Sequence, residues 1–342
     1  MNSLLNTLYV TTQGAYLKRD HENLVVLIEQ KEALRIPIRQ LGDLVLFGRV
    51  TVSHGIIALC NENRLAVTYM SNNGEFLGQL RGPTSGNVLL RLNQYALHNA
   101  PEQSVAVARN CVAGKINNCR NLLMRACRDT SDQDDMLALR TAANRLRQIL
   151  AKLKDTDQID TIRGYEGDAA YTYFRAFTRM IKSDREAFRF DTRNRRPPRD
   201  PINALLSFAY ALLAKDCTAS LDAVGLDPQI GYLHVPRPGR PSLALDLMEE
   251  FRPIVADRLI LTLVNRKQIT ADDFECIGGT ARLHDAPRKR LLVAYQERKK
   301  HEVPHTVLER NVPLGLVPHL QAKLMARVIR KELKDYPPFI HR

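Results

Sequence analysis

Several features common in other proteins are missing from this sequence. It has no tryptophan, and no two of its cysteines are spaced as C-x-x-C, which excludes a zinc ribbon or a dithiol motif. No segment approaches the roughly 18 apolar residues of a membrane span. Residues 1–6 lack the basic and apolar parts of a signal peptide. These absences predict a cytoplasmic protein, in which the 6 cysteines are mostly small buried residues.

Acidic residues are scarce relative to basic ones. The 342-residue chain has 50 Lys and Arg against 37 Asp and Glu, a formal net charge of +13. Such an excess suits a polyanionic partner, because each neutralised phosphate releases counterions. The charge alone does not separate nucleic acid from an anionic membrane. No basic amphipathic helix with an aromatic apolar face is evident, so the composition favours nucleic acid.

The chain changes character near residue 90. Before that point, short β-branched or aromatic runs alternate with turn residues, and a short helix fits between Ser53 and Asn63. The predicted strands lie at residues 8–11, 24–28, 44–47 and 65–69, followed by a hairpin at Asn73 and Gly74. We therefore predict an α+β protein that begins with a β-rich domain at residues 1–90. Its several sheet edges favour dimerisation or docking.

Residues 91–342 have a helical pattern, with apolar residues three and four positions apart. Residues 155–157 offer N-cap side chains for a helix at about 158–182, and Pro253 divides a helical segment at 243–264. Further helices are predicted at residues 116–128, 136–153, 203–213 and 316–335. The segment 286–311 is basic and interrupted by prolines. The larger domain is thus predicted to be all-α.

Glu166 stands between two glycines in the sequence RGYEG at residues 163–167. Two glycines within one helical turn cost roughly 1 kcal/mol each relative to alanine, so something other than helix propensity keeps them there. Glycine beside a carboxylate lets a bulky ligand or a DNA backbone come close. The alternative interpretation is an ordinary helix start with an exposed acid.

His234 precedes a stiff loop rich in proline and glycine, which suits a ligand, although a lone histidine is more often structural. The helix that follows, with Ser242 as its N-cap, carries Asp246, Glu249 and Glu250. At about 100° per residue, Asp246 and Glu249 point away from the apolar stripe and lie about 60° apart, whereas Glu250 leans toward the edge of the stripe. Helical geometry allows Asp246 to pair with Glu249 or with Glu250 and does not choose between them.

A histidine with carboxylates is a mixed nitrogen and oxygen site, which favours Mn²⁺ or Mg²⁺, with Zn²⁺ chemically possible. At a phosphodiester such an ion polarises the phosphoryl oxygen, generates the nucleophile and stabilises the leaving oxygen. The sequence HEVPH at residues 301–305 has metalloprotease spacing, but that site needs a continuous helix, which Pro304 disfavours. We interpret it as a basic surface loop.

Basic residues gather in three places, at residues 193–199, 288–290 and 298–300. A charge run is usually a solvated face, but their number indicates at least one cluster that contacts DNA. Because few aromatic residues are interleaved, phosphate contact is favoured over base stacking. The candidate DNA contacts are Lys115, Arg163, Arg193, Arg195, Arg196 and Arg240.

Taken together, several motifs resemble the family of CRISPR-associated spacer-acquisition integrases over the full length of the chain, and most closely its type I-C branch. They are GKINN at residues 114–118, RGYEG at 163–167, PPRDPINALLSF at 197–208, LH at 233–234 and SLALDLMEEFRP at 242–253. By motif, the family's metal ligands fall on Glu166, His234 and Glu249, with Asp246 as an assisting acid. One departure is Cys119, where the family pattern has glutamine, and it puts a helix-surface contact in doubt.

The resemblance also implies the activity. In this family the 3′ hydroxyl of a DNA fragment attacks a phosphodiester of the CRISPR repeat with the help of Mg²⁺ or Mn²⁺, and the same site can hydrolyse double-stranded or branched DNA. The family forms homodimers through the β domains and binds a small second adaptation protein. In this branch an accessory iron–sulfur exonuclease often trims the fragments. The competing interpretations are a catalytically silent DNA-binding scaffold and a metalloprotease.

Overall fold

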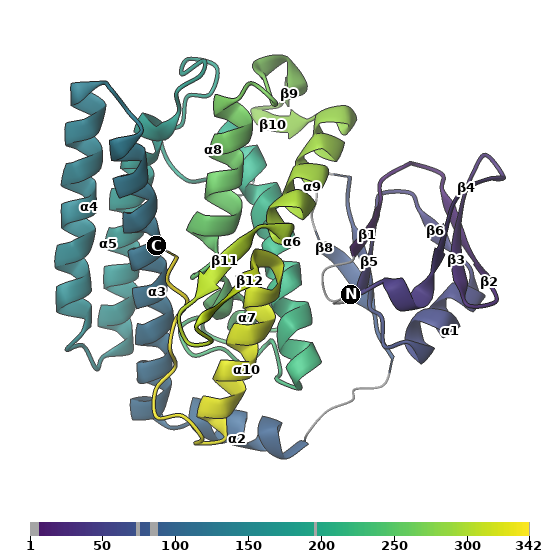
Figure 1. Cartoon of the computed structure of the whole chain (residues 1–342), viewed down its shortest axis with the longest axis horizontal. Helices are drawn as coiled ribbons and strands as arrows, with labels where there is room; N and C mark the ends of the chain where they lie inside the picture. The colour runs from purple at the N-terminus through teal and green to yellow at the C-terminus, as the bar shows by residue number, and fades with distance from the viewer. Residues whose placement is uncertain (1–6, 73–75, 83–87, 195–196, 342) are drawn as a thin grey trace. The chain divides into compact units, whose positions relative to one another are not determined.

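The computed structural model describes residues 7–72, 76–82, 88–194 and 197–341. The chain divides into two compact units, Met1–Ser85 and Gly86–Arg342 (Figure 1). The smaller unit is rich in strands and the larger one is mainly helical, which confirms the α+β class.

The smaller unit contains two four-stranded sheets within its described residues. In the first, β1, β5 and β7 run parallel and β8 is antiparallel to β7. In the second, β4, β3 and β2 are antiparallel neighbours, and β6 runs parallel to β2. The strands are β1 (Thr7–Val10), β2 (Tyr16–Asp20), β3 (Asn23–Ile28), β4 (Lys31–Pro37), β5 (Asp43–Phe47), β6 (Thr51–Val52), β7 (Val67–Met70) and β8 (Phe76–Leu80).

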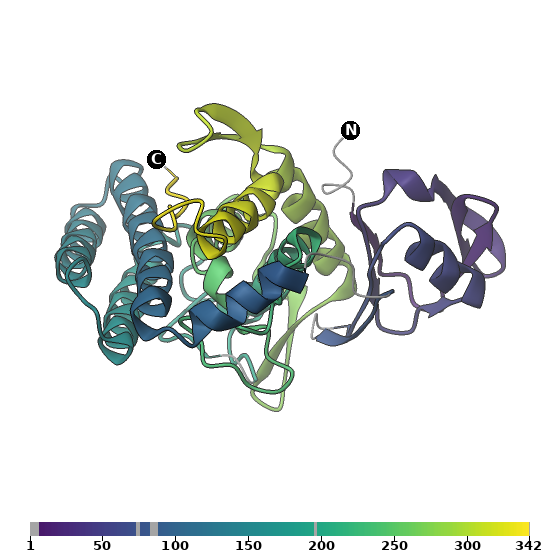
Figure 2. The ribbon, with the colours of Figure 1, turned by 90° about the horizontal axis from the view of Figure 1, so that it is seen from below.

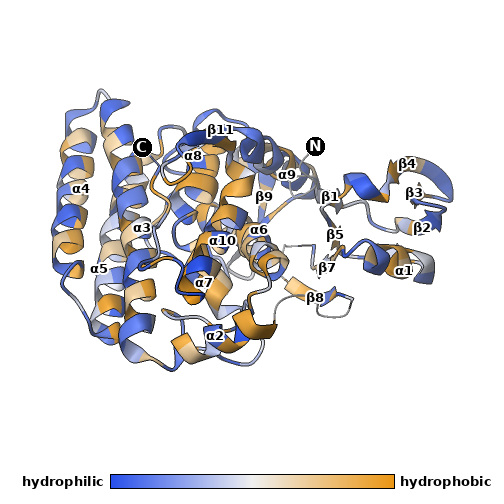
Figure 3. Cartoon of the chain, turned by 60° about the horizontal axis from the view of Figure 1, so that its bottom comes forward, coloured by the Kyte–Doolittle hydropathy of each residue, from blue (hydrophilic) through white to orange (hydrophobic). Residues whose placement is uncertain are grey.

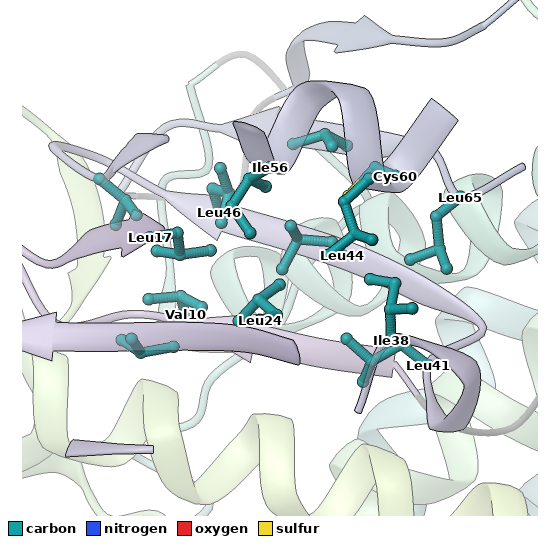
Figure 4. Packing of buried hydrophobic residues seen from close by; sticks show 14 of the residues in the cluster. Val10, Leu17, Leu24, Ile38, Leu41, Leu44, Leu46, Ile56, Cys60 and Leu65 are labelled. Atoms are coloured by element: carbon teal, nitrogen blue, oxygen red, sulfur yellow. The ribbon is translucent and has the colours of Figure 1, made fainter. Parts of the chain in front are cut away.

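Apolar side chains from both sheets form the core of this unit. Leu17 and Leu24 come from one sheet and Leu44 and Leu46 from the other, and all four are fully or almost fully buried (Figure 4). Helix α1 (His54–Glu62) adds Ile56, Leu59 and Cys60 to the cluster. Every residue of β5 is buried, as expected of a parallel strand with neighbours on both sides.

The strands predicted from β-branched and aromatic runs are confirmed as β1, β3, β5 and β7. The predicted short helix is also confirmed, and the Ser53 hydroxyl caps it by accepting a hydrogen bond from the amide of Ile56. Strands β2, β4 and β6 were missed because they carry few buried apolar residues; no residue of β4 is buried. The hairpin expected at Asn73 and Gly74 lies outside the described residues.

Helices account for most of the larger unit. They are α2 (Val88–His98), α3 (Pro101–Arg128), α4 (Gln133–Leu153), α5 (Ile159–Phe177), α6 (Pro201–Val224), α7 (Ser242–Met248), α8 (Arg258–Asn265), α9 (Asp285–Lys300) and α10 (Val317–Ile329). A π-helical segment, η4 (Arg252–Asp257), joins α7 to α8. Short 3₁₀ turns across the two units are η2 (Ile38–Gln40), η3 (Thr178–Met180), η5 (Ala271–Asp273) and η6 (Leu314–Leu316).

Helices α3, α4 and α5 pack side by side, and α6 packs against α7, α10 and η4 (Figure 2). Hydrophobic residues dominate α8 and α10, whereas α9 is mostly hydrophilic (Figure 3). Among the described residues, α6 alone is long and apolar enough for a membrane span by length and composition. Its apolar residues are largely buried inside the helical unit, so it serves here as a core helix.

Three local predictions for this unit were wrong. The larger domain is not all-α, because β9 (Phe274–Ile277) pairs with β10 (Thr280–Leu283), and β11 (Glu302–His305) pairs with β12 (Arg310–Pro313). Residues 155–157 do not cap α5, whose N-cap, Gln158, makes no side-chain cap bond. Ser242 is the first residue of α7 rather than its N-cap, and its hydroxyl donates to the carbonyl of Val235 at 3.1 Å.

The HEVPH sequence is not a surface loop as predicted, because β11 includes Pro304 and His305, and His305 is buried. A strand does not place His301 and His305 on one face of a helix, so the rejection of a helical metalloprotease motif is confirmed.

Candidate active site

His234 is held by a buried carboxylate on the helix that follows it. Asp246, on α7, is fully buried and accepts hydrogen bonds from the backbone amides of Tyr232 at 2.6 Å, Leu233 at 2.9 Å and His234 at 2.9 Å. It also contacts His234 Nδ1 at 2.7 Å. Because a carboxylate accepts this bond, Nδ1 carries the hydrogen, and in the neutral imidazole the lone pair is at Nε2. The imidazole is thereby oriented as a ligand with Nε2 available.

Other elements fix the same loop. Arg163 of α5 donates from two guanidinium nitrogens to the carbonyl of Leu233, at 3.0 and 2.9 Å. Gln94 of α2 donates to the carbonyls of Asp227 and Ile230, and His98 Nδ1 lies 2.8 Å from the carbonyl of Gly231. The part played by α2 was not foreseen, since no local pattern links residues that lie more than 130 positions apart.

Gly231 has a steric role that the sequence did not reveal. A Cβ atom at this position would lie 2.7 Å from the Ser242 carbonyl carbon and 2.9 Å from Asp246 Oδ2. Only glycine therefore lets the loop pass so close to the start of α7.

Glu249 lies just beyond the end of α7 and is 3% exposed. Its Oε1 is 3.1 Å from Arg252 Nε and 4.0 Å from His234 Nε2. Its Oε2 is 2.7 Å from the ammonium of Lys115. Burial raises the pKa of Glu249, but the charges of Arg252, Lys115 and His234 lower it by more than burial raises it, to about 2. Glu249 is therefore a carboxylate at neutral pH.

Lys115 of α3 joins Glu249 to the third predicted ligand. Its ammonium also forms an ion pair with Oε1 of Glu166, on α5. Burial lowers the pKa of Lys115, but the two carboxylates raise it more, so it stays above its ordinary value. The lysine thus stands as a cation between two carboxylates that come from different helices.

The three acids after His234 have different surroundings from those expected. Asp246, Glu249 and Glu250 are all buried, so the side of the helix opposite the apolar stripe is not a solvated face. Helix α7 has only seven residues and is covered on all sides, by the His234 loop, α3, α6 and α10. The helical wheel identified the apolar stripe but not what covers the opposite face.

Glu250 anchors the C-terminal segment. Its carboxylate accepts hydrogen bonds from the hydroxyl of Tyr336, the amide of Phe339 and the side chain of Gln321, at 2.6, 2.6 and 3.2 Å. Gly114 of α3 makes room for it, because a Cβ there would lie 2.9 Å from Glu250 Cγ. Burial raises the pKa of Glu250 to about 8, although these hydrogen bonds lower it. Glu250 therefore has a structural role, because it holds the C-terminal segment against α7.

The glycines beside Glu166 leave the surface of α5 open. A Cβ at Gly164 or at Gly167 would meet nothing within 4 Å. Packing within the protein thus does not require glycine at either position, which fits the predicted approach of a bulky ligand. Cys119, the departure from the family pattern, is buried, so it does not affect a helix-surface contact as predicted.

The predicted DNA contacts occupy unlike positions. Lys115 is buried between carboxylates, and Arg163 braces the His234 loop. Arg193 donates to Asn203 and Ser207 and lies over the ring of Tyr210. Arg240 is in the loop between His234 and α7, whereas Arg195 and Arg196 lie outside the described residues. Whether any of them binds DNA stays a prediction.

A divalent cation fits this centre chemically. In the described part of the chain, no three His, Cys, Asp or Glu side chains are close enough as arranged to hold a metal ion. Glu249 Oε2 is nevertheless buried, and its ion pair with the Lys115 ammonium at 2.7 Å shows that this oxygen already faces a cation. Two carboxylates on either side of that ammonium, with an oriented imidazole 4.0 Å from Glu249 Oε1, form a donor set that suits a hard cation.

Fold and site together define an α+β protein in which two acids flank a lysine ammonium and one histidine lies close to one of those acids. The family model for CRISPR associated protein Cas1 matches residues 8–297. A CRISPR-associated endonuclease Cas1 of Moorella thermoacetica is 48% identical over 343 residues, covering 100% of each chain. One from Rhodospirillum rubrum is 46% identical, covering 99% of each. The chain belongs to the Cas1 family.

Further matches bear on the fold and on partners. The structure of a Cas1 protein from Thermotoga maritima has a TM-score of 0.82 and 25% identity, covering 95% of this chain and 97% of that one. A fusion of exonuclease Cas4 with endonuclease Cas1 from Geobacter sulfurreducens is 37% identical, covering 98% of this chain and 60% of the fusion. One chain of a Cas6-RT-Cas1–Cas2 complex has a TM-score of 0.83 at 23% identity, and the match covers 98% of this chain and 36% of that one.

Proposed function

We propose that this protein is a divalent-metal-dependent DNA endonuclease and integrase that inserts DNA fragments into a CRISPR array. The supporting observation is that one cation, Lys115, bridges Glu166 and Glu249 while His234 Nε2 lies 4.0 Å from Glu249 Oε1, in a chain of the Cas1 family. The relatives at 48% and 46% identity are themselves named Cas1 endonucleases.

The chain's own residues divide the work at this site. Asp246 holds the His234 imidazole so that Nε2 is available, and Arg163 and α2 fix the loop that carries it. Arg252 keeps Glu249 oriented and ionised. When bound, Mg²⁺ or Mn²⁺ would supply the positive charge that activates the attacking oxygen and stabilises the leaving oxygen of the phosphodiester.

A group of arginines on the helical unit supports a DNA substrate. A cavity of about 250 Å³ lies beside α3 and η4, and its lining includes Arg125, Arg128 and Arg258. Among the described residues, Asp129 is the only acid that forms an ion pair with any of these three arginines, at 3.7 Å from Arg125. This excess of cations, like the total of +13, favours phosphate contacts.

The decisive experiment compares Glu166→Gln with a matched control, Glu297→Gln, which removes an exposed acid of α9. A labelled fragment with a 3′ hydroxyl is incubated with repeat DNA and Mn²⁺. We expect Glu166→Gln to join less than about one thousandth of the wild-type amount while retaining DNA affinity, because metal ligands supply the chemistry and basic residues supply most of the binding. Joining by Glu166→Gln at the wild-type rate would exclude Glu166 as a ligand.

The same assay tests the alternative of a silent scaffold. If the wild-type protein binds branched DNA but neither joins nor cleaves it with either metal, the scaffold interpretation replaces the enzymatic one. Cleavage that stops when EDTA is added favours the enzyme.

We also propose the type I-C branch, a homodimer joined through the β-rich units, and a cytoplasmic location. The branch is supported by the motif wording, and dimerisation by Phe76 and Leu77 of β8, which are 61% and 64% exposed. Integration into type I-C repeats in preference to repeats of other types would test the branch. A monomeric mass for the full-length protein at micromolar concentration would exclude the dimer.

Two further partners are proposed. The solved complex that contains Cas1 and Cas2 supports assembly with a small second adaptation protein, and the Cas4/Cas1 fusions support a link to an exonuclease. Co-purification of the separately expressed proteins, followed by measurement of complex mass, tests both.

A further inference from the structure

The ammonium of Lys115 occupies the centre of the proposed metal site. It contacts Glu166 on one side and Glu249 on the other, and its side chain is 10% exposed. Glu166 belongs to α5 and Glu249 follows α7, so no local segment holds these two acids together. The lysine side chain reaches them from a third helix, α3.

The charges of this cluster nearly balance without a metal. Three carboxylates, Asp246, Glu166 and Glu249, accompany two cations, Lys115 and Arg252. A divalent ion added to that set would leave a net positive charge in a mostly buried site, which is unfavourable in low-dielectric surroundings. One of the resident cations therefore has to withdraw when the ion binds.

Arg252 is the less mobile of these two cations. Its guanidinium lies 4.6 Å from the ring centroid of Tyr210, and its Nε is 3.1 Å from Glu249 Oε1. Lys115 instead has a flexible four-carbon stem, and among the described residues its ammonium is held only by its ion pairs with Glu166 and Glu249. Rotation about the stem bonds moves the ammonium without moving the backbone of α3.

We propose that Lys115 holds the place of the metal: its ammonium keeps Glu166 and Glu249 together in the metal-free protein and leaves the position between them when a divalent cation binds. This inference rests on the proposed function and concerns how the same site is loaded. It makes Lys115 a competitor of the metal. A lysine with a purely structural role would instead help metal binding by keeping the carboxylates in position.

The two roles predict opposite signs for one measurement. Mn²⁺ affinity is measured by titration calorimetry on Lys115→Met, which keeps the unbranched stem up to the ε position and removes the ammonium. We expect Mn²⁺ to bind at least tenfold more tightly than to the wild-type protein. The control is Lys152→Met, which removes an exposed charge of α4 and should leave the affinity unchanged. Equal or weaker binding by Lys115→Met overturns the inference.

A parallel titration of Glu166→Gln separates this inference from the proposed function. If Glu166→Gln loses Mn²⁺ binding but Lys115→Met does not gain it, only the place-holding role fails. If Glu166→Gln binds Mn²⁺ as tightly as the wild-type protein, the metal site itself is wrong. Should Lys115→Met fail to fold, Lys115→Gln gives the same comparison with a polar side chain.

Displacement can also be measured in the wild-type protein. Acylation of lysine amines is quantified by mass spectrometry with and without Mn²⁺, with Lys152 as the internal reference. Because Mn²⁺ takes the two carboxylates from Lys115, we expect its labelling to rise at least twofold. Unchanged or reduced labelling at saturating Mn²⁺ contradicts displacement.

Discussion

Replacing Asp246 by asparagine should disrupt the loop that carries His234. The carboxylate accepts four hydrogen bonds, two at each oxygen: Oδ2 from the amides of Tyr232 and Leu233, and Oδ1 from the amide and the ring Nδ1 of His234. Whichever way the amide of asparagine turns, its nitrogen cannot accept. One bond is lost if the nitrogen faces His234, because the imidazole can change tautomer and accept at Nδ1, and two are lost if it faces the amides of Tyr232 and Leu233.

The magnitude follows from these contacts. A hydrogen bond to a charged group contributes about 1.5–3 kcal/mol, so losing one or two lowers the free energy of unfolding by about 1.5–6 kcal/mol. Asp246 is fully buried, so solvent does not compensate for the loss. A matched control is Asp134→Asn in the first turn of α4, which removes an exposed carboxylate and should change the free energy by less than about 0.5 kcal/mol.

Two assays without metal check this prediction. Denaturant unfolding gives the change in free energy, and hydrogen exchange gives the protection of the amides of Tyr232, Leu233 and His234. We expect those amides to exchange faster in Asp246→Asn and raised Mn²⁺ to restore little activity, because the imidazole is no longer positioned. Unfolding within about 1 kcal/mol of wild type, together with unchanged exchange of the three amides, would refute this view of Asp246.

Three further predictions concern single sites or the whole surface. Gly231→Ala should lower the free energy of unfolding by about 1–3 kcal/mol in denaturant titrations, because its Cβ would lie 2.7 Å from the Ser242 backbone. The Cβ of Gly167→Ala would meet nothing within 4 Å, so this variant should not destabilise the fold, but it should slow integration if DNA approaches there. Because the pKa of Glu250 is raised from 4.5 to about 8, its stabilising contribution is complete below pH 4.5 and is lost as the pH rises through 8. The stability of wild type relative to Glu250→Gln should therefore fall by about 1.4 kcal/mol per pH unit between these values, and a flat difference in unfolding titrations contradicts this. Finally, DNA affinity should fall steeply with salt, and neutralising Arg195 and Arg196 together should reduce the log–log slope by about two contacts; a slope near zero for the wild-type protein excludes the phosphate contacts.

The smaller unit shows which strands can be predicted from a sequence. Strands such as β5, whose residues are all buried, stand out as continuous apolar runs. Strand β4 has the sequence KEALRIP and no buried residue, and it is a strand because β3 offers it a hydrogen-bonding edge. That edge is a property of the folded sheet, so no local pattern could have identified β4.

In the larger unit, the ends of helices were harder to predict than their existence. Helix α3 begins at Pro101, well before the predicted residue 116, although Val105, Ala108 and Val112 already have helical spacing and are buried. The segment after His234 was correctly expected to divide near Pro253, but the division includes a π-helical segment, η4. A proline signals an interruption, whereas packing decides the form of the backbone around it.

The sequence by itself determined the α+β class and the excess of positive charge. Through motif resemblance it also led to the prediction that Glu166, His234 and Glu249 are metal ligands. These properties depend on the order and type of residues, which are read directly from the chain. Only the tertiary structure decided that Asp246 orients His234, that Glu250 anchors the C-terminal segment, and that Lys115 lies between two carboxylates. A helical wheel shows which side chains share a face, but the charge and burial of each depend on neighbours that are distant in sequence and meet only when the helices pack.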